Sequence, residues 1–262
     1  MKIALHSDLH DDVYHGADRF FQAYPELPAA DVVILAGDNH RSDQIIEFAE
    51  QLRQKQHAKA AIVIAGNHEF YQTDYDRALQ LMRDTAADLQ QVHFLEQDSI
   101  VIDGVRFLGT TLWTDFELFG ADTKARAMTE ASAVMMDYRA IEYKGRMLTA
   151  EDTVDLFNQA YPWLCQTVAE PHNGKTVAIT HHVPSFQCLP PRYADLMSSA
   201  AFGSNLDKLI EKELADIWVY GHTHYSQQLQ VGKTQLCSNA RGYFSESNRT
   251  GYQHDFIIDL TE

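Results

Sequence analysis

Five apolar runs in this chain are continuous, with no alternation of apolar and polar positions. They are Ile3 to Leu5, Val32 to Ala36, Ala60 to Ala65, Val177 to Ile179 and Ile217 to Tyr220. Continuous short runs of this kind are typical of strands buried on both faces of a sheet. The pattern therefore predicts strands at these five places.

Segments with helical spacing lie between the second and third runs and after the third. Ile45, Ala49 and Leu52 recur at helical intervals behind Ser42, which we expect to cap that helix. A second helix should begin at a Thr73 and Asp76 capping box. Its apolar stripe would be Tyr75, Leu79, Met82, Ala86 and Leu89. Alternation of strands and helices predicts a parallel βαβ core at the front of the chain.

The middle of the chain has a different pattern. Three short strand signals lie between Val92 and Trp113, around the hairpin dipeptide Asp103-Gly104. Residues from about 114 to 168 are predicted to be helices and loops that cover one edge of the core. Within them, Thr149 and Asp152 form a capping box.

The helix that this box begins should bury Phe157, Tyr161 and Leu164, with a kink expected at Pro162. A further helix is predicted near Ser204 to Leu214. Closing strands are predicted in residues 226–240, with a turn at Gly232-Lys233, and in residues 254–260. Because no linker or repeat marks a boundary, we expect one α/β domain over residues 1–262.

Composition is that of an ordinary globular protein, with 262 residues of which 45% are hydrophobic and 22% charged. The 37 acidic and 21 basic residues give a net charge of −16, so long-range attraction to nucleic acid is not expected. An anionic substrate would need positive charge from bound cations or from local arginines.

Three cysteines, Cys165, Cys188 and Cys237, have no C-x-x-C spacing, which favours a reducing compartment over a disulfide framework. No apolar run approaches the roughly 20 residues of a membrane span. The first residues also lack the apolar region of a signal peptide. We therefore expect a cytoplasmic protein that does not associate with membranes.

Polar residues able to bind metal follow each of the five apolar runs. The segments are "HSDLH", "GDNH", "GNHEF", "THHVP" and "GHTH". Because ligand sites in α/β proteins form beyond the carboxyl ends of strands, these five segments should gather at one end of the molecule. In the last segment His222 and His224 are two positions apart, so both can face the same side of an extended chain.

Each of these residues has an ordinary alternative explanation when it is taken alone. Asp8 could be a turn residue, Asn67 could form an Asx turn and His10 could lie on the surface. Coincidence at five strand ends is a poor explanation for the whole set, which therefore predicts a metal site. Nitrogen and oxygen donors without thiolates suit two divalent ions. Two such ions, roughly 3.5 to 4 Å apart, can activate water for attack on phosphorus or carbonyl centres.

Taken in order, these motifs resemble the calcineurin-like metallophosphoesterase superfamily over almost the whole chain. The matching residues are Asp8, His10, Gly37, Asp38, Gly66, Asn67, His68, Glu69, Thr180, His181, His182, and Gly221 to His224. The stretches "GTTLWTDF", "MMDYRAI" and "SNARGY" are similar to a branch of small bacterial members whose substrates are mostly unassigned.

The resemblance implies a four-layer fold of two facing mixed β-sheets flanked by helices. It also implies a metallophosphoesterase domain with two divalent ions, manganese first and iron, zinc or nickel as alternatives. One ion would take Asp8, His10 and His224, and the other Asn67, His181 and His222, with Asp38 bridging. A hydroxide that bridges the ions would attack phosphorus, and His68 would protonate the leaving oxygen. His182 remains an alternative ligand to His181.

Departures from the family pattern narrow the substrate to a small phosphodiester or phosphomonoester. Protein phosphatases carry G-D-x-x-D-R-G, whereas this chain has "GDNHRSD". Many cyclic-nucleotide phosphodiesterases keep an aspartate where this chain has Arg41. Arg139 and Arg241 are candidate phosphate contacts.

Two further functions remain to be weighed against a phosphoesterase. A metal-binding scaffold of the same fold with weak or no catalysis is the main alternative. A metallo-β-lactamase type of hydrolase needs H-x-H-x-D-H, but Tyr225 and Ser226 follow the histidine pair here. A nuclease would be a special case of the phosphoesterase, and the acidic composition offers no basic track for a nucleic-acid strand.

Overall fold

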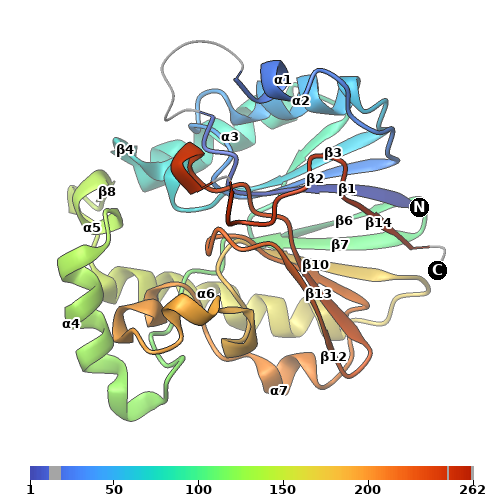
Figure 1. Cartoon of the computed structure of the whole chain (residues 1–262). Coiled ribbons are helices and arrows are strands. Elements are labelled where there is room, and N and C mark those ends of the chain that lie inside the picture. The colour runs from blue at the N-terminus through green and yellow to red at the C-terminus, as the bar shows by residue number, and fades with distance from the viewer. Residues whose placement is uncertain (12–18, 247, 261–262) are drawn as a thin grey trace.

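Two β-sheets face each other at the centre of the fold (Figure 1). The computed structural model describes residues 1–11, 19–246 and 248–260. The first sheet has the order β14-β1-β2-β3-β5 and the second β12-β13-β11-β10-β7-β6. The strands of the first sheet are β1 (Lys2–His6), β2 (Val32–Ala36), β3 (Ala60–Ile64), β5 (Val92–Phe94) and β14 (Ile257–Asp259). Those of the second are β6 (Asp98–Ile102), β7 (Val105–Thr110), β10 (Thr176–Thr180), β11 (Ile217–Val219), β12 (Gln227–Val231) and β13 (Thr234–Ser238).

Both sheets are parallel in their centres and mixed at their edges. Strands β1, β2, β3 and β5 run parallel, as do β7, β10, β11 and β13. Antiparallel strands β14, β12 and β6 are added at the edges. The expected strands and the hairpins at Asp103-Gly104 and Gly232-Lys233 are all present.

Alternate residues of each central strand bury opposite faces of the sheet. Ile3 and Leu5 belong to the core between the two sheets, together with Phe107 and Val177. Ala4, between Ile3 and Leu5, belongs instead to the core that includes the helices. Because both faces are buried, these strands need apolar residues at every position, which explains their unbroken hydrophobic pattern.

Helices cover the outer face of each sheet (Figure 1). On the first sheet lie α1 (Arg19–Ala23), α2 (Ile45–Lys55) and α3 (Tyr75–Ala87), and on the second α6 (Ala150–Ala169) and α7 (Asp207–Ile210). Short 3-10 helices are η1 (His68–Phe70), η2 (Ala121–Thr123), η3 (Phe186–Cys188), η4 (Pro191–Tyr193), η5 (Met197–Ala201) and η6 (Phe244–Glu246). The predicted four-layer arrangement is confirmed.

Two of the predicted helix starts are wrong by one or two residues. Helix α2 has Gln44 as its N-cap residue without a side-chain cap, in place of Ser42. Helix α3 is capped by Asp74, whose carboxylate accepts from the backbone N–H of Arg77 at 3.1 Å. The residue before it, Thr73, is occupied by strand pairing.

Other helix predictions had mixed outcomes. The Thr149–Asp152 capping box of α6 is confirmed, and the helix continues through Pro162. The helix predicted at Ser204 to Leu214 is reduced to the short α7.

The excursion at residues 114–168, predicted to cover one edge of the core, consists of helices and short strands. It forms α4 (Lys124–Val134), α5 (Asp137–Ala140), β8 (Ile141–Tyr143), β9 (Arg146–Met147) and α6. Helix α6 packs on the outer face of the second sheet, where Arg106 of β7 donates to its last carbonyls. Helices α4 and α5 lie at one end of the sandwich, and β8 joins β4 (Thr73–Asp74) in a small third sheet (Figure 1).

Across the described residues, the structure contains no helix with the length and apolarity needed to cross a membrane.

Candidate metal centre

Side chains from five strand ends meet at one end of the two sheets. Three groups of histidine and aspartate ligand atoms lie there, each with its atoms within 4.8 Å of one another. The groups are Asp8, His10 and His224; His10, Asp38 and His68; and Asp38, His181 and His222. The predicted convergence of these segments is therefore a feature of the structure.

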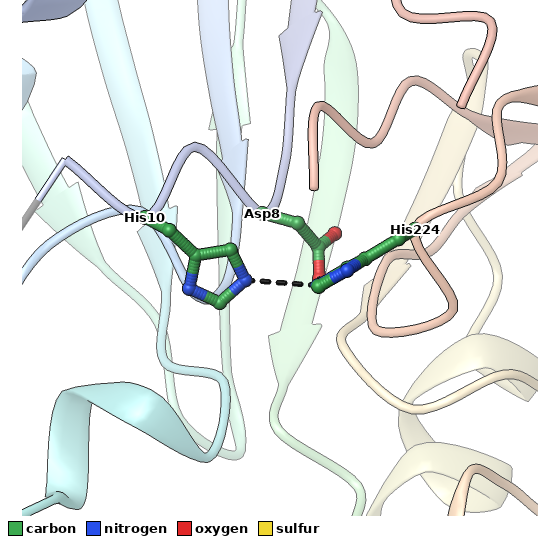
Figure 2. Close-up of side chains that lie close together, drawn as sticks. All are labelled: Asp8, His10 and His224. Carbon is green, nitrogen blue, oxygen red and sulfur yellow. Dashed lines mark hydrogen bonds and ion pairs between the residues drawn. The ribbon is translucent and has the colours of Figure 1, made fainter. Parts of the chain in front are cut away.

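The first group joins the loop after β1 to the loop after β11. Figure 2 shows the rings of His10 and His224 pointing toward each other beside the carboxylate of Asp8. The Nε2 atoms of the two histidines are 2.9 Å apart, and His224 Nε2 lies 3.6 Å from Asp8 Oδ1. The backbone N–H of His222 donates to both Asp8 oxygens, which ties the two loops together.

The third group lies around His181, just after β10. Its Nε2 atom is 3.2 Å from Asn67 Oδ1, 3.1 Å from His222 Nδ1 and 3.4 Å from Asp38 Oδ2. His182 instead directs Nδ1 to the carbonyl of Thr111 at 3.2 Å. The geometry thus places His181 in the cluster and His182 behind it.

Asp38 and His68 belong to the remaining group, which shares His10 with the first group and Asp38 with the third. Asp38 belongs to two of the three groups, and its Oδ1 accepts from the backbone N–H of His68 at 2.8 Å. The His68 ring stacks on Tyr71 at 4.1 Å, and its Nε2 is 3.2 Å from the hydroxyl of Tyr243. The side chain keeps 11% of its surface exposed, so it can meet a ligand.

The backbone at these strand ends has an uncommon conformation. Five of the predicted ligands have positive φ angles: Asp8, His10, Asp38, His222 and His224. Such angles are uncommon outside glycine, although aspartate and histidine adopt them more readily than most residues. They turn each side chain sharply away from its strand and toward the shared centre.

Glycines permit the close approach of these loops. A Cβ atom on Gly66 would collide with the carboxylate of Asp38, and one on Gly37 with the ring of His181. A Cβ on Gly221 would meet Ser7 and Asp8. Glycine is therefore required at the start of the G-D, G-N-H-E and G-H-T-H segments, because there is no room for a side chain at these three positions.

The donors present fit divalent cations. Buried His10 Nδ1 and His222 Nε2 have no hydrogen-bond partner among the described residues. Ring nitrogens also face ring nitrogens in the His10–His224 and His181–His222 pairs. Nitrogen and carboxylate lone pairs converging in a buried space are the donor set that divalent transition metals accept.

Charges in the cluster shift one another's pKa values. Burial lowers the pKa of His181, but the neighbouring Asp38 outweighs it and raises the pKa to about 10. Burial raises the pKa of Asp38, yet His181 and His68 hold it well below its usual value. Burial raises the pKa of Asp8 to about 6 and lowers that of His68. His68 therefore tends to be neutral until a negatively charged ligand approaches it.

Acidic residues to which the sequence analysis gave no role hold the predicted ligands. Glu246 accepts from His224 Nδ1 at 2.6 Å, the carboxylate–histidine arrangement common around protein metals. Asp137 accepts from the amide of Asn67 at 2.8 Å. Glu69 accepts from the backbone N–H of Asp38 and of Gly66. Because these acidic residues are far in the sequence from most of the groups they hold, no local pattern indicated the contacts. Asp137 and Glu69 do lie in stretches that resemble the family, "MMDYRAI" and "GNHEF".

A cavity of about 240 Å³ opens beside the cluster. Its lining includes the ligand and acid–base groups of Asp38, Asn67 and His68. It also includes apolar and aromatic side chains, here called the apolar wall: Val134, Met135, Met136, Tyr193 and Phe202. A larger surface hollow of about 600 Å³ lies along β5 and β6, away from the cluster. Chemistry, not size, makes the smaller cavity the candidate site.

Neither predicted phosphate-binding arginine lines this cavity among the described residues. Arg139 donates to the carbonyl of Ala133, and Arg241 donates to that of Leu9 near Asp11. Arg192 also lies beside the site, because its guanidinium donates to the carbonyls of Thr223 and His224.

Comparison with known proteins defines the class. The family model of calcineurin-like phosphoesterases matches residues 1–226, and the chain belongs to that family. Phosphopantetheinyl hydrolase from Mycobacterium tuberculosis has a similar structure, with TM-score 0.75 and 19% identity over 100% of this chain and 97% of that one. A dimetal phosphatase from Danio rerio has TM-score 0.49 and 12% identity over 91% of this chain and 87% of its own.

A relative in sequence is the "Uncharacterized protein L509" of Acanthamoeba polyphaga mimivirus. It is 21% identical over 201 residues, which are 71% of this chain and 69% of the relative. The resemblance inferred from the sequence motifs is thus confirmed at the level of family and fold. The family implies a phosphate-ester substrate, and the histidine and aspartate groups could bind divalent metal ions.

Proposed function

We propose that this protein is a dinuclear metal-dependent phosphoesterase that hydrolyses phosphodiesters or small phosphomonoesters. The observation that carries the proposal is the meeting of Asp38 with residues from all the other strand ends in one buried cluster. The family match is consistent with this activity.

In this proposal each predicted ligand has a defined place. One ion would be held by Asp8, His10 and His224, and the other by Asn67, His181 and His222, and Asp38 is close enough to both sets to serve either ion. Manganese is the first candidate, and iron, zinc or nickel suit the same donors. When bound, such ions supply positive charge for the phosphoryl oxygens and an activated water.

His68 acts on the leaving group. Its ring is held between Tyr71, the hydroxyl of Tyr243 and His10 at the wall of the cavity. Negative charge on a bound phosphate ester raises the pKa of the neighbouring imidazole, which counters the lowering by burial. The protonated ring can then donate its proton to the departing oxygen.

The apolar wall of the cavity favours esters with an uncharged apolar group. Phe202 packs edge-on against His222 at 5.2 Å and against Tyr193 at 5.1 Å. Val134 and Met136 are 60% and 52% exposed, although both are apolar. An ester group that covers these side chains removes apolar surface from water, which favours binding by about 25 cal/mol for each Å² buried.

Hydrolysis assays test the proposal. Metal-replete protein should hydrolyse p-nitrophenyl phosphate, bis(p-nitrophenyl) phosphate or both, and elemental analysis should find two ions per chain. His68→Ala should keep both ions and lower turnover by about 10²- to 10⁴-fold. Two bound ions without turnover of either ester would favour the metal-binding scaffold instead. Loss of metal in His68→Ala would make His68 a ligand.

A further inference from the structure

Asp137 is a buried carboxylate at the start of α5, in the excursion that packs against the candidate metal centre. It is 3% exposed. Its Oδ1 atom accepts two hydrogen bonds, one from Asn67 Nδ2 at 2.8 Å and one from the Tyr71 hydroxyl at 2.7 Å. No lysine or arginine among the described residues forms an ion pair with it.

The first of these bonds determines which way the amide of Asn67 points. An asparagine amide has a donor end and an acceptor end of nearly equal size. Because a carboxylate only accepts, it holds the NH₂ end of Asn67 toward Asp137. The Oδ1 end is thereby turned to His181, 3.2 Å from its Nε2 atom. Only this end of the amide carries lone pairs for a cation.

The second bond connects the same carboxylate to His68. The Tyr71 hydroxyl also lies 3.1 Å from Asn67 Nδ2, so the three side chains form a closed triangle of hydrogen bonds. The Tyr71 ring stacks on His68 with an interplanar angle of 28°. A shift of Asp137 would therefore disturb a predicted ligand and the predicted acid together.

We propose that Asp137 is a positioning residue that makes Asn67 a metal ligand and keeps Tyr71 stacked beneath His68. This inference rests on the ligand role given to Asn67 in the proposed function. It also gives the excursion a role in the site, because α5 supplies a group that the strand ends lack.

The test is metal binding by stripped, folded protein, measured by calorimetric titration with Mn²⁺. Asp137→Ala should weaken one of two binding steps by about 10- to 100-fold and leave the other unchanged. Asn67→Ala should weaken the same step, and the double variant should lose no more than the greater single loss. Asp137→Asn keeps an acceptor oxygen and should lose less affinity than Asp137→Ala.

A matched control separates positioning from folding. Asp152 is also a buried carboxylate of the excursion, but it binds Arg146 and caps α6. Asp152→Ala should lower the melting temperature and leave both binding steps unchanged. Unchanged binding in Asp137→Ala, equal weakening of both steps, or additive losses with Asn67→Ala would overturn the inference.

Tyr71 gives a second measurement. Tyr71→Phe retains the ring on His68 and loses the hydroxyl, so metal affinity should fall more than turnover at saturating metal. Tyr71→Leu should in addition lower turnover. Equal turnover in the two variants would contradict the role of the stack. Because the binding measurements need no substrate, they can succeed even if the protein hydrolyses no phosphate ester.

Discussion

Glu69→Gln is the substitution that most directly tests how the strand ends are held together. Glu69 is 1% exposed, and its carboxylate accepts four backbone N–H groups. Oε2 accepts from Asp38 at 2.9 Å and from Gly66 at 2.7 Å. Oε1 accepts from Asn39 at 2.9 Å and, more weakly, from His40 at 3.5 Å. These bonds join the end of β2 to the end of β3, so they fix Asp38 relative to Asn67.

The size of the expected loss of stability follows from the number of hydrogen bonds that the substitution removes. A glutamine has one acceptor oxygen, and its best placement still leaves the N–H of Asn39, together with the more distant N–H of His40, facing an NH₂ group. An unpaired buried N–H costs about 1 to 3 kcal/mol. For a chain of this size the melting temperature should fall by about 2 to 12 °C. Metal affinity should fall about tenfold because a group that supports Asp38 is altered.

Thermal unfolding of metal-free protein at pH 9 measures the first effect. Burial and the neighbouring Asp38 raise the pKa of Glu69 to about 8, so the wild-type group is ionised at that pH. Glu96→Gln is the control, because Glu96 is also buried but accepts from Thr110 and Thr111. It should lower stability without changing metal affinity. A melting temperature within 1 °C of wild type for Glu69→Gln would refute the reasoning.

Two more predictions concern protons and substrate. In the metal-free protein the pKa of His181 is raised to about 10. The stabilisation that its proton gives the fold is fully present below the unfolded pKa near 6.5, and this stabilisation is lost as the pH rises through 10. Because a cation must displace this proton, metal binding between pH 7 and 9 should release about one proton at His181, and the metal affinity should rise about tenfold per pH unit. Calorimetry in buffers of different ionisation enthalpy measures the proton release and the affinity. An affinity that does not change with pH would contradict this prediction. Phe202→Ala should raise KM for bis(p-nitrophenyl) phosphate more than for methyl p-nitrophenyl phosphate, with metal content unchanged. Equal changes in KM for the two esters would show that the apolar wall does not take part in substrate recognition.

Much of the fold was predictable because its signals are local. A strand buried on both faces must be apolar throughout, so the central strands are visible in the sequence. Helix starts were less exact. Thr73 and Asp74 can both cap a helix, and the pairing of Thr73 with Ile141 of β8 left Asp74 as the cap. That pairing joins residues far apart in the chain, and no local pattern reports it.

The candidate site likewise combines features set by local sequence patterns with contacts between residues far apart in the chain. The strand ends that carry Asp38, Asn67 and His222 were identifiable because polar residues follow apolar runs there, and parallel strands bring their carboxyl ends together. Arg139 and Arg241 were chosen by residue type, and the structure directs both to backbone carbonyls. Residue type alone does not determine where a long side chain points.

What the sequence determined by itself is the set of strand ends and the chemistry of the groups that follow them, because burial and turn preferences act between near neighbours. Only the tertiary structure decided which acidic groups hold these side chains. Glu246 is 22 residues from His224, and Asp137 is 70 residues from Asn67. Such contacts depend on how separate loops pack, which is fixed by the whole fold. The tertiary structure also brought His181 Nε2 to Asn67 and directed His182 Nδ1 to the carbonyl of Thr111, because both partners come from other loops of the fold.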